Sequence, residues 1–335
     1  MRILIVNQKE VPALLPMAAC MEAMAGALSA VSRGEALLPL RQVLMLPNQA
    51  GAFGVMPAYL TTPAAVGVKS ITVFPGNHGT ELDSHQGAVL LFETERGRLL
   101  AVMDASSITA IRTAAVSGVA TRLLARAGAG DLALLGTGVQ ALTHLEAVAL
   151  ARPLRRVRAW SRKPEHVHAF AERAGRLLGQ KVEAAASARE AVEGADIVCT
   201  VTSSREPVLK GEWLSPGVHV NAVGASLAAA RELDTAAIVR ARLFVDRRES
   251  TLNEAGDFLI PRREGAVDDG HIQAELGELL LGRHPGRQTE TETTVFKSLG
   301  LAVEDVAAAR LIYDNALKSG AGTAVELGGA RDAGA

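Results

Sequence analysis

The stretch LALLGTGVQA, residues 132–141, decides the fold of this chain. Its apolar start predicts a buried strand, and the periodic segment 141–151 predicts a helix directly after it. The turn between them fits the dinucleotide pattern G-x-G-x-x-G/A. Gly136 permits the tight turn, Gly138 lets the backbone approach a pyrophosphate, and the small Ala141 lets the helix pack closely on the strand. The phosphates would lie at the helix N-terminus, where free N–H groups and the helix dipole attract anions.

Strand and helix patterns alternate after residue 131. Strands are expected at 132–135, 156–160, 182–184, 197–201, 218–223 and 243–246, with helices at 141–151, 164–178 and 188–192 between them. This alternation predicts a Rossmann-type, doubly wound parallel sheet with helices on both faces.

The first third of the chain follows another pattern. After a helix at 11–31, successive strands are expected, and with the opening strand they cover 3–6, 37–46, 53–59, 65–74, 88–93 and 99–103. A long helix, 108–125, follows them, and near the end the segment 303–319 forms another helix before a frayed tail, 320–335. The fold class is therefore α/β with a second, strand-rich α+β domain.

Composition excludes several classes of function. The 335 residues include 35 Lys and Arg against 36 Asp and Glu, and only 3% aromatics, so neither a nucleic acid nor a membrane surface is expected as a partner. No signal-peptide pattern or membrane-spanning run is visible. Cys20 and Cys199 are isolated in the sequence, and we expect them to be buried thiols of a cytoplasmic protein.

The end of the second parallel strand bears on the choice of cofactor. NAD-preferring domains usually carry an acidic residue there, about 20 residues past the glycines, to bind the ribose 2′-OH. This chain has Ser161, Arg162 and Lys163 instead. A hydroxyl and two cations suit a 2′-phosphate, which favours NADP(H), with NAD(H) still possible. Alternatively, the two cations are the solvated start of a helix.

Three cations lie on otherwise apolar segments: Arg41, Lys69 and Arg112. A charge that faces a core is costly unless it has a partner. Each of the three could be a substrate ligand, or else a snorkelling or salt-bridged residue.

No metal site is expected. His166 and His168 are two apart on a predicted helix and point in different directions. Glu254 and Asp257, in NEAGDF, lack nearby histidine partners and are expected in a loop over the site.

Together these stretches resemble the ornithine cyclodeaminase/mu-crystallin family, and more closely its mu-crystallin-like ketimine reductase branch. The matching pieces are VMPAY (55–59), AVMDASSITAIRTAAVSGVAT (101–121), GTGVQA (136–141), HVNAVGAS (219–226), REL (231–233) and TTVFKSLGLAVEDVAAA (293–309). The resemblance implies a homodimer with a dinucleotide-binding domain, 121–301. It also implies a substrate-binding and dimerisation domain built from 1–120 and 302–335.

The resemblance also implies roles for single residues. Arg41, Lys69 and Arg112 would bind the carboxylate of an α-amino, α-keto or α-imino acid, and Lys69, then His85, is the expected proton source. Leu299 would wall the substrate pocket, or is a core leucine, and His85 could be a purely structural loop residue. The implied cofactor contacts are Ser84, His85, Arg112, Thr113, Gly136, Thr137, Gly138, Val139, Gln140, Ser161, Arg162, Lys163, Thr200, Val201, Thr202, Val223 and Ser226.

Ser226 is an informative departure. Family members that cyclise ornithine carry an Asp at this position and a Lys shortly after it, where this chain has Ser226 and Ala230. A serine of ordinary pKa cannot act as a carboxylate base. Mu-crystallin-like proteins share the serine. We therefore expect Lys69, Arg112 and Ser226 to be catalytic residues of a reductase and to contact its substrate.

The sequence thus predicts NAD(P)H-dependent reduction of a small cyclic imino acid, Δ1-pyrroline-2-carboxylate or Δ1-piperideine-2-carboxylate. Three alternatives stay open. They are an amino-acid dehydrogenase or N-alkylating reductive aminase acting on a keto acid, an ornithine cyclodeaminase, and a non-catalytic NADPH-dependent binding protein.

Overall fold

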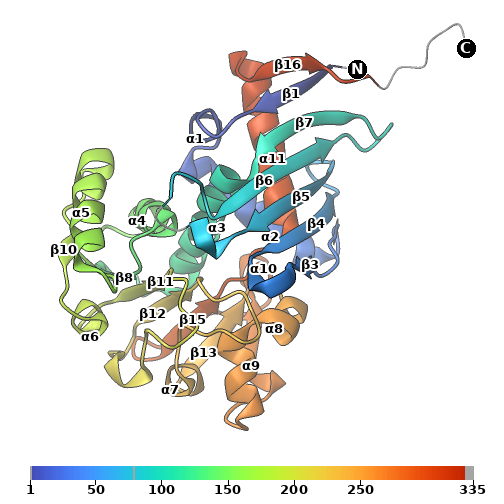
Figure 1. Cartoon of the computed structure of the whole chain (residues 1–335). Coiled ribbons are helices and arrows are strands. Elements are labelled where there is room, and N and C mark those ends of the chain that lie inside the picture. The colour runs from blue at the N-terminus through green and yellow to red at the C-terminus, as the bar shows by residue number, and fades with distance from the viewer. Residues whose placement is uncertain (1, 78–79, 329–335) are drawn as a thin grey trace, which may run out of the picture. The chain divides into compact units, whose positions relative to one another are not determined.

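The computed structural model describes residues 2–77 and 80–328, and the chain divides into two compact units. Unit 1 is Met1–Arg112 with Leu301–Ala335, and unit 2 is Thr113–Gly300. Unit 1 is therefore built from both ends of the chain, and unit 2 from its middle (Figure 1).

Unit 1 contains one mostly antiparallel sheet backed by two long helices. The helices are α2 (Met17–Arg33) and α11 (Ala302–Ser319), and a short α1 (Val11–Leu14) precedes them. The strands are β1 (Arg2–Val6), β2 (Ala36–Leu37), β3 (Gln42–Met45), β4 (Ala52–Leu60), β5 (Ala65–Val73), β6 (His85–Phe92), β7 (Leu99–Asp104) and β16 (Thr323–Glu326). Their order is β16-β1-β7-β6-β5-β4-β2, and β3 also pairs with β4. Helix α11 packs against α2 and against β4, β5 and β6.

Unit 2 contains a parallel sheet. Its strands are β8 (Asp131–Leu135), β9 (Arg156–Trp160), β10 (Glu183–Ala184), β11 (Ile197–Thr200), β12 (His219–Ala222), β13 (Ala241–Val245), β14 (Ile272–Glu275) and β15 (Thr293–Lys297). They run in the order β10-β9-β8-β11-β12-β15-β13-β14. The order reverses at β8, with β9 on one side and β11 on the other, as in a doubly wound Rossmann sheet. The predicted α/β fold class is confirmed.

From α4 on, the helices of unit 2 follow strands along the chain (Figure 1). Helix α3 (Ala105–Leu124) begins in unit 1 and ends in unit 2. The others are α4 (Val139–Ala151), α5 (Pro164–Leu178), α6 (Ala188–Val192), α7 (Thr235–Val239), α8 (Arg248–Glu254), α9 (Gly256–Arg263) and α10 (Leu276–Leu280). Short 3-10 helices lie at η1 (Pro47–Gln49), η2 (Pro75–Asn77), η3 (Gly211–Trp213) and η4 (Asp269–His271).

Two expected elements of unit 1 are divided in the structure. The helix expected at 11–31 is interrupted before Met17, because Pro16 has no N–H to continue a helical ladder. The strand expected at 37–46 is split into β2 and β3, and Arg41 lies half-exposed between them. The prediction of one strand with Arg41 in its middle was therefore wrong.

The tail also differs from the prediction. Residues 323–326 form β16 and pair antiparallel with β1, with Val325 opposite Ile3. The expected fraying was therefore wrong for this segment. Residues 329–335 of the predicted tail lie outside the described part of the chain.

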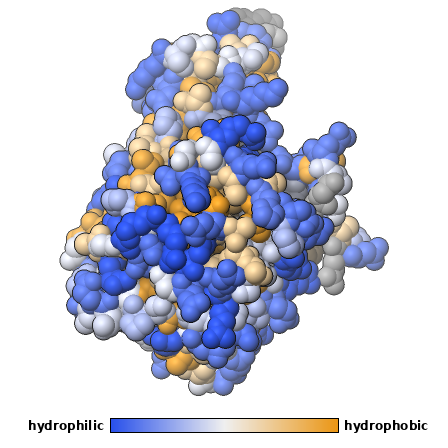
Figure 2. Space-filling model, turned by 90° about the vertical axis from the view of Figure 1, so that its left-hand side faces the viewer, coloured by the Kyte–Doolittle hydropathy of each residue, from blue (hydrophilic) through white to orange (hydrophobic). Residues whose placement is uncertain are grey.

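The surface combines hydrophilic and apolar side chains. On the face shown in Figure 2, hydrophilic residues predominate and hydrophobic ones form smaller groups between them. Four large exposed apolar side chains of unit 1 lie on β2 and β3: Leu37, Val43, Leu44 and Met45. Across 2–77 and 80–328, no helix combines the length and apolarity needed to cross a membrane.

Candidate active site

A buried cluster of four charged side chains lies in unit 1. Lys69 comes from β5, Arg112 from α3, and Glu304 and Asp305 from the first turn of α11; none is more than 4% exposed. Lys69 Nζ lies 2.8 Å from Asp305 Oδ2. Arg112 donates through Nε to Asp305 Oδ1 at 3.0 Å and through Nη1 to Glu304 Oε2 at 2.7 Å. Asp305 therefore bridges both cations.

Local structure explains why these groups meet. Burial alternates along β5, which places Lys69 on the same face as Ala65 and Ile71, and α11 packs against this strand. The two acids stand in the first turn of α11, where the positive end of the helix dipole stabilises negative charge.

The cluster shifts the pKa values of its members. Burial, followed by the charge of Arg112, lowers the pKa of Lys69 to about 8, and Asp305 offsets this only in part. Burial would raise the pKa of Asp305, but the charges of Arg112 and Lys69 outweigh it, so this pKa lies below its usual value. Burial lowers the pKa of Arg112, but Asp305 and Glu304 outweigh it and raise that pKa overall.

Glu304 and Asp305 were not predicted as site residues, although they lie in the matching stretch LAVEDVAAA (301–309). The available signal was a pair of acids inside an otherwise apolar helix. Their presence means that Lys69 and Arg112 are salt-bridged, which was the alternative to a purely ligand-binding role. Arg112 Nη2 has no hydrogen-bond partner among the described residues, so the guanidinium keeps a donor for an anion. The ligand-binding role of Lys69 and Arg112 stays a prediction.

The other predicted residues of unit 1 lie closer to solvent. Arg41 is half-exposed, and its charge contributes to lowering the pKa of Lys69. His85 starts β6 and is exposed, and its Nδ1 lies 3.0 Å from the Ser84 hydroxyl. The hydroxyl of Ser106 donates to the carbonyl of His85.

In unit 2, the turn from β8 to α4 has the shape that the fingerprint predicts. Gly136 has φ +116°, and a Cβ there would lie 2.7 Å from the carbonyl oxygen of Val201, so only glycine fits. Gly138 caps α4, and a Cβ added to it would meet nothing within 4 Å. The space beside Gly138 is therefore open, at the N-terminal end of α4. This arrangement fits the phosphates of a dinucleotide.

The residues after β9 are available to a ligand. The side chains of Arg162 and Lys163 are exposed and form no ion pair with the described residues, and Ser161 is half-buried. The alternative of a solvated helix start is also consistent with this exposure, because α5 begins at Pro164.

The remaining predicted residues of unit 2 occupy several places. Thr113 is buried in α3, and Val139 and Gln140 start α4 directly after Thr137 and Gly138. Thr200, Val201 and Thr202 end or follow β11, and Val223 and Ser226 follow β12. Ser226 is half-buried and has no hydrogen-bond partner among the described residues. Leu299, which follows β15, is 7% exposed and belongs to the apolar core of unit 2.

The predicted loop at Glu254 and Asp257 was wrong. Glu254 ends α8 and Asp257 lies in α9, where it is 1% exposed and forms an ion pair with Lys297 Nζ at 2.9 Å. No group of three or more potential metal ligands occurs within the described residues. The absence of a metal remains a prediction.

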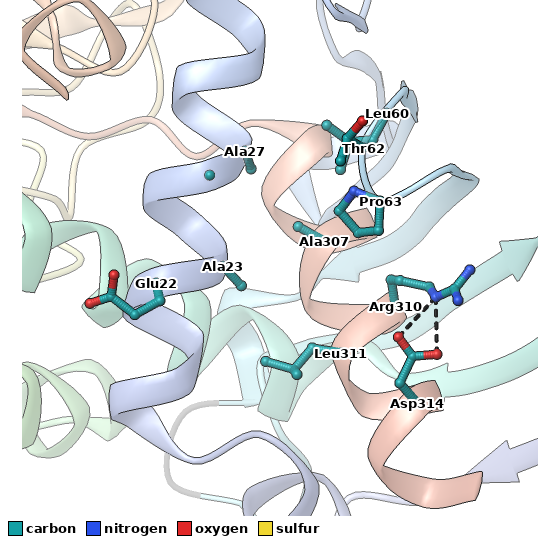
Figure 3. A pocket seen from close by; sticks show the side chains of 11 residues that line it. Glu22, Ala23, Ala27, Leu60, Thr62, Pro63, Ala307, Arg310, Leu311 and Asp314 are labelled. Atoms are coloured by element: carbon teal, nitrogen blue, oxygen red, sulfur yellow. Dashed lines mark hydrogen bonds and ion pairs between the residues drawn. The ribbon is translucent and has the colours of Figure 1, made fainter. Parts of the chain in front are cut away.

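A pocket of about 280 Å³ opens between α2 and α11 in unit 1 (Figure 3). Small and apolar side chains such as Ala23, Ala307 and Leu311 line it, with the Arg310–Asp314 ion pair at one side. None of the predicted site residues lines this pocket.

Comparisons with known proteins agree with the geometry. The model of the ornithine cyclodeaminase/mu-crystallin family matches residues 1–320. The ketimine reductase mu-crystallin of Mus musculus is 45% identical over 282 residues, which cover 84% of this chain and 86% of that protein.

Two solved structures are also similar. The Δ1-pyrroline-2-carboxylate reductase of Thermococcus litoralis, in complex with NADH and L-proline, has a TM-score of 0.94 and 39% identity, covering 96% of this chain and 99% of that one. An archaeal alanine dehydrogenase dimer with bound NAD has a TM-score of 0.91 and 32% identity, covering 97% and 99%.

Proposed function

Since the chain belongs to the ornithine cyclodeaminase/mu-crystallin family, we propose that it reduces a small cyclic imino acid with NAD(P)H. The observation that carries the proposal is the buried cluster of Lys69, Arg112, Glu304 and Asp305. Two similar proteins are a ketimine reductase and a Δ1-pyrroline-2-carboxylate reductase, which supports the same class of substrate.

The cluster suits a substrate that carries one carboxylate next to an imine. Glu304 and Asp305 fix the Arg112 guanidinium, so that it meets the carboxylate in a set orientation with little loss of side-chain entropy. The half-exposed Arg41 would add a third cation. Because two acids already balance two buried cations, the substrate carboxylate would be held by hydrogen bonds, such as one from Arg112 Nη2, and not by an excess of positive charge in the cluster.

Lys69 is the proposed proton source. With a pKa of about 8, its Nζ holds a proton at neutral pH and releases it more readily than an ordinary lysine. When bound in unit 2, a nicotinamide dinucleotide supplies the hydride. The Ser226 hydroxyl has no hydrogen-bond partner within the described residues, so it is available to orient the substrate.

NADP(H) is the proposed cofactor, with NAD(H) as the alternative. The exposed Arg162 and Lys163 after β9 support a 2′-phosphate, and Gly136 to Gln140 would hold the pyrophosphate. We assign the dinucleotide to the domain 121–301, and substrate binding and dimerisation to 1–120 with 302–335.

A homodimer in the cytoplasm is the proposed form of the protein. The similar archaeal alanine dehydrogenase is described as a dimer. The exposed apolar side chains of β2 and β3 offer a surface in unit 1 that association would cover. Cys20 and Cys199 are buried free thiols, as is usual in a reducing compartment.

Steady-state kinetics test the reaction. NADPH and NADH should each be assayed with Δ1-pyrroline-2-carboxylate and Δ1-piperideine-2-carboxylate, and turnover of at least one ring is expected. An Arg112→Ala variant should lose most of this activity. Absence of cofactor oxidation with both imines would refute the proposal.

The same assay separates the alternatives. The likeness to the alanine dehydrogenase favours a keto-acid reaction as the second candidate, so pyruvate with ammonia or methylamine belongs in the assay. Ammonia release from ornithine would point to a cyclodeaminase despite Ser226. Tight NADPH binding without any turnover would identify a binding protein.

A further inference from the structure

Two carboxylates and one lysine form a buried network in unit 2. Glu232 is fully buried and accepts hydrogen bonds at Oε1 from N and Oγ1 of Thr202, at 2.6 and 2.7 Å, and at Oε2 from N of Gly224, at 2.6 Å. Asp257 Oδ1 accepts from N of Glu232 at 2.8 Å. Its Oδ2 forms the ion pair with Lys297.

The network joins the ends of three neighbouring strands. Thr202 follows β11, Gly224 follows β12 and Lys297 ends β15, and these strands are adjacent in the parallel sheet. Lys297 Nζ also donates to the carbonyl of Ala225 at 2.6 Å. A Cβ at position 224 would lie 2.6 Å from a Glu232 carboxylate oxygen and 2.1 Å from the Thr202 carbonyl oxygen, so glycine is required there. Glu232 thus fixes the backbone that follows both β11 and β12.

The network carries one net negative charge, because two carboxylates face one ammonium. Two of the three donors to Glu232 are backbone N–H groups, which cannot accept a proton, so the hydrogen bonds select the ionised carboxylate. Burial, followed by the charge of Asp257, raises the pKa of Glu232, and Thr202 and Lys297 oppose this shift. With all three charged side chains at most 1% exposed, water screens the charge weakly.

The charge lies at the ends of β11 and β12. In a doubly wound sheet, the two halves of a dinucleotide bind on opposite sides of the point where strand order reverses. The predicted 2′-phosphate ligands follow β9, so the nicotinamide half belongs on the side of β11 and β12, whose ends Glu232 holds. Oxidised nicotinamide carries a positive charge that the reduced ring lacks.

We propose that Glu232 positions these two strand ends for the nicotinamide half and that its charge strengthens binding of the oxidised cofactor relative to the reduced one. Glu232 acts through Thr202 and Gly224 and is a positioning residue. The inference rests on the proposed function only in taking a nicotinamide dinucleotide as the cofactor.

Cofactor titration without imine tests the inference. The full chain is titrated with the oxidised and reduced forms of whichever cofactor, NADP or NAD, binds more tightly, and both dissociation constants are measured. Glu232→Gln should weaken binding of the oxidised form about tenfold more than binding of the reduced form. An unchanged ratio of the two constants, with or without overall weakening, overturns the proposal.

A second variant keeps the test decisive if Glu232→Gln does not fold. Asp257→Asn keeps an acceptor for N of Glu232 and removes one negative charge, so the ratio should change in the same direction. Glu264→Gln is the matched control, because Glu264 is an exposed acid of unit 2 that pairs with Arg231; an equal change there would refute the assignment to Glu232. Wild-type protein that binds both cofactor forms but reduces neither imine would contradict the proposed function alone.

Discussion

The negative charge of Asp305 should contribute strongly to the stability of unit 1. It pairs with Lys69 and Arg112 at once, so Asp305→Asn leaves a buried cation without its counter-ion. We expect the free energy of unfolding to fall by about 3 kcal/mol. Urea unfolding measures this directly.

Asp314→Asn is the matched control for this prediction. Asp314 lies on the same helix, α11, but pairs with Arg310 near the surface, so its loss should cost less than about 1 kcal/mol. Equal losses in the two variants would show that the buried pairing of Asp305 is not what stabilises unit 1.

The lowered pKa of Lys69 predicts that the activity falls at alkaline pH. Its pKa of about 8 means that the free protein loses the ammonium above that pH, and with it a proton source and a partner for the substrate carboxylate. We expect kcat/KM with a cyclic imine to fall about tenfold per pH unit above about pH 8. A Lys69→Arg variant should lose most of the activity, because arginine stays charged and does not release a proton near neutral pH. An active variant without the fall above about pH 8 would show that Lys69 acts only as a partner for the substrate carboxylate. A flat wild-type profile to about pH 10 would contradict the role of Lys69.

In the turn between β8 and α4, substitutions at two glycines should affect stability and cofactor binding separately. Gly136→Ala should lower the free energy of unfolding by about 1–3 kcal/mol, because its φ is positive and the added Cβ meets the Val201 carbonyl. Gly138→Ala has open space, so the melting temperature should stay unchanged while the affinity for the cofactor falls about tenfold or more. Unchanged affinity in Gly138→Ala would argue against phosphate binding at this turn.

Hydrogen bonds that involve buried histidines connect helix α3 to α4 and to the sheet of unit 2. His144 accepts from or donates to Ser117 at 2.9 Å, and His219 contacts Asn221, which donates to Thr121 of α3. Burial lowers the pKa of His144 to about 4 and that of His219 to about 3. Below about pH 6.5 these two histidines therefore bind protons in the unfolded chain but not in the folded chain. The free energy of unfolding falls as the pH drops.

Lowering the pH from about 7 to about 5 should cost about 2 kcal/mol for each of these histidines. Urea unfolding at both pH values measures the loss. His144→Gln should reduce this dependence on pH, whereas His168→Gln, which changes an exposed histidine, should not. Identical dependence in both variants would contradict the assignment.

The elements that could be predicted from the sequence are those set by a local pattern. The fingerprint turn and the strand 156–160 are set by short-range periodicity, and β9 has the predicted bounds. The helices α7 to α10 have only 5 to 8 residues, too few to display a helical period, and were not foreseen. The pairing of Arg112 with Glu304 and Asp305 joins residues 192 and 193 positions apart, so no local pattern shows it.

For the whole molecule, the exposed apolar side chains of β2 and β3 predict a dimer. If β3 forms the dimer contact, Leu44→Asp should convert a dimer to a monomer, because a buried charge would replace a side chain that is 62% exposed in the single chain. Light scattering after size-exclusion chromatography gives the mass. Leu177→Asp, on α5, is the control and should stay dimeric. A wild-type monomer, or a Leu44→Asp dimer, would refute this surface.

The pairing of β1 with β16, and the packing of α11 inside unit 1, also constrain the order of events on the ribosome. Unit 2 is fully translated once Gly300 has emerged, whereas unit 1 must wait for Ala302–Ser319, although its first hundred residues were made first. Until then Lys69 and Arg112 lack both counter-ions and the apolar face of β4 to β6 is uncovered. The oldest part of the nascent chain is therefore the last to mature and the part most in need of a chaperone.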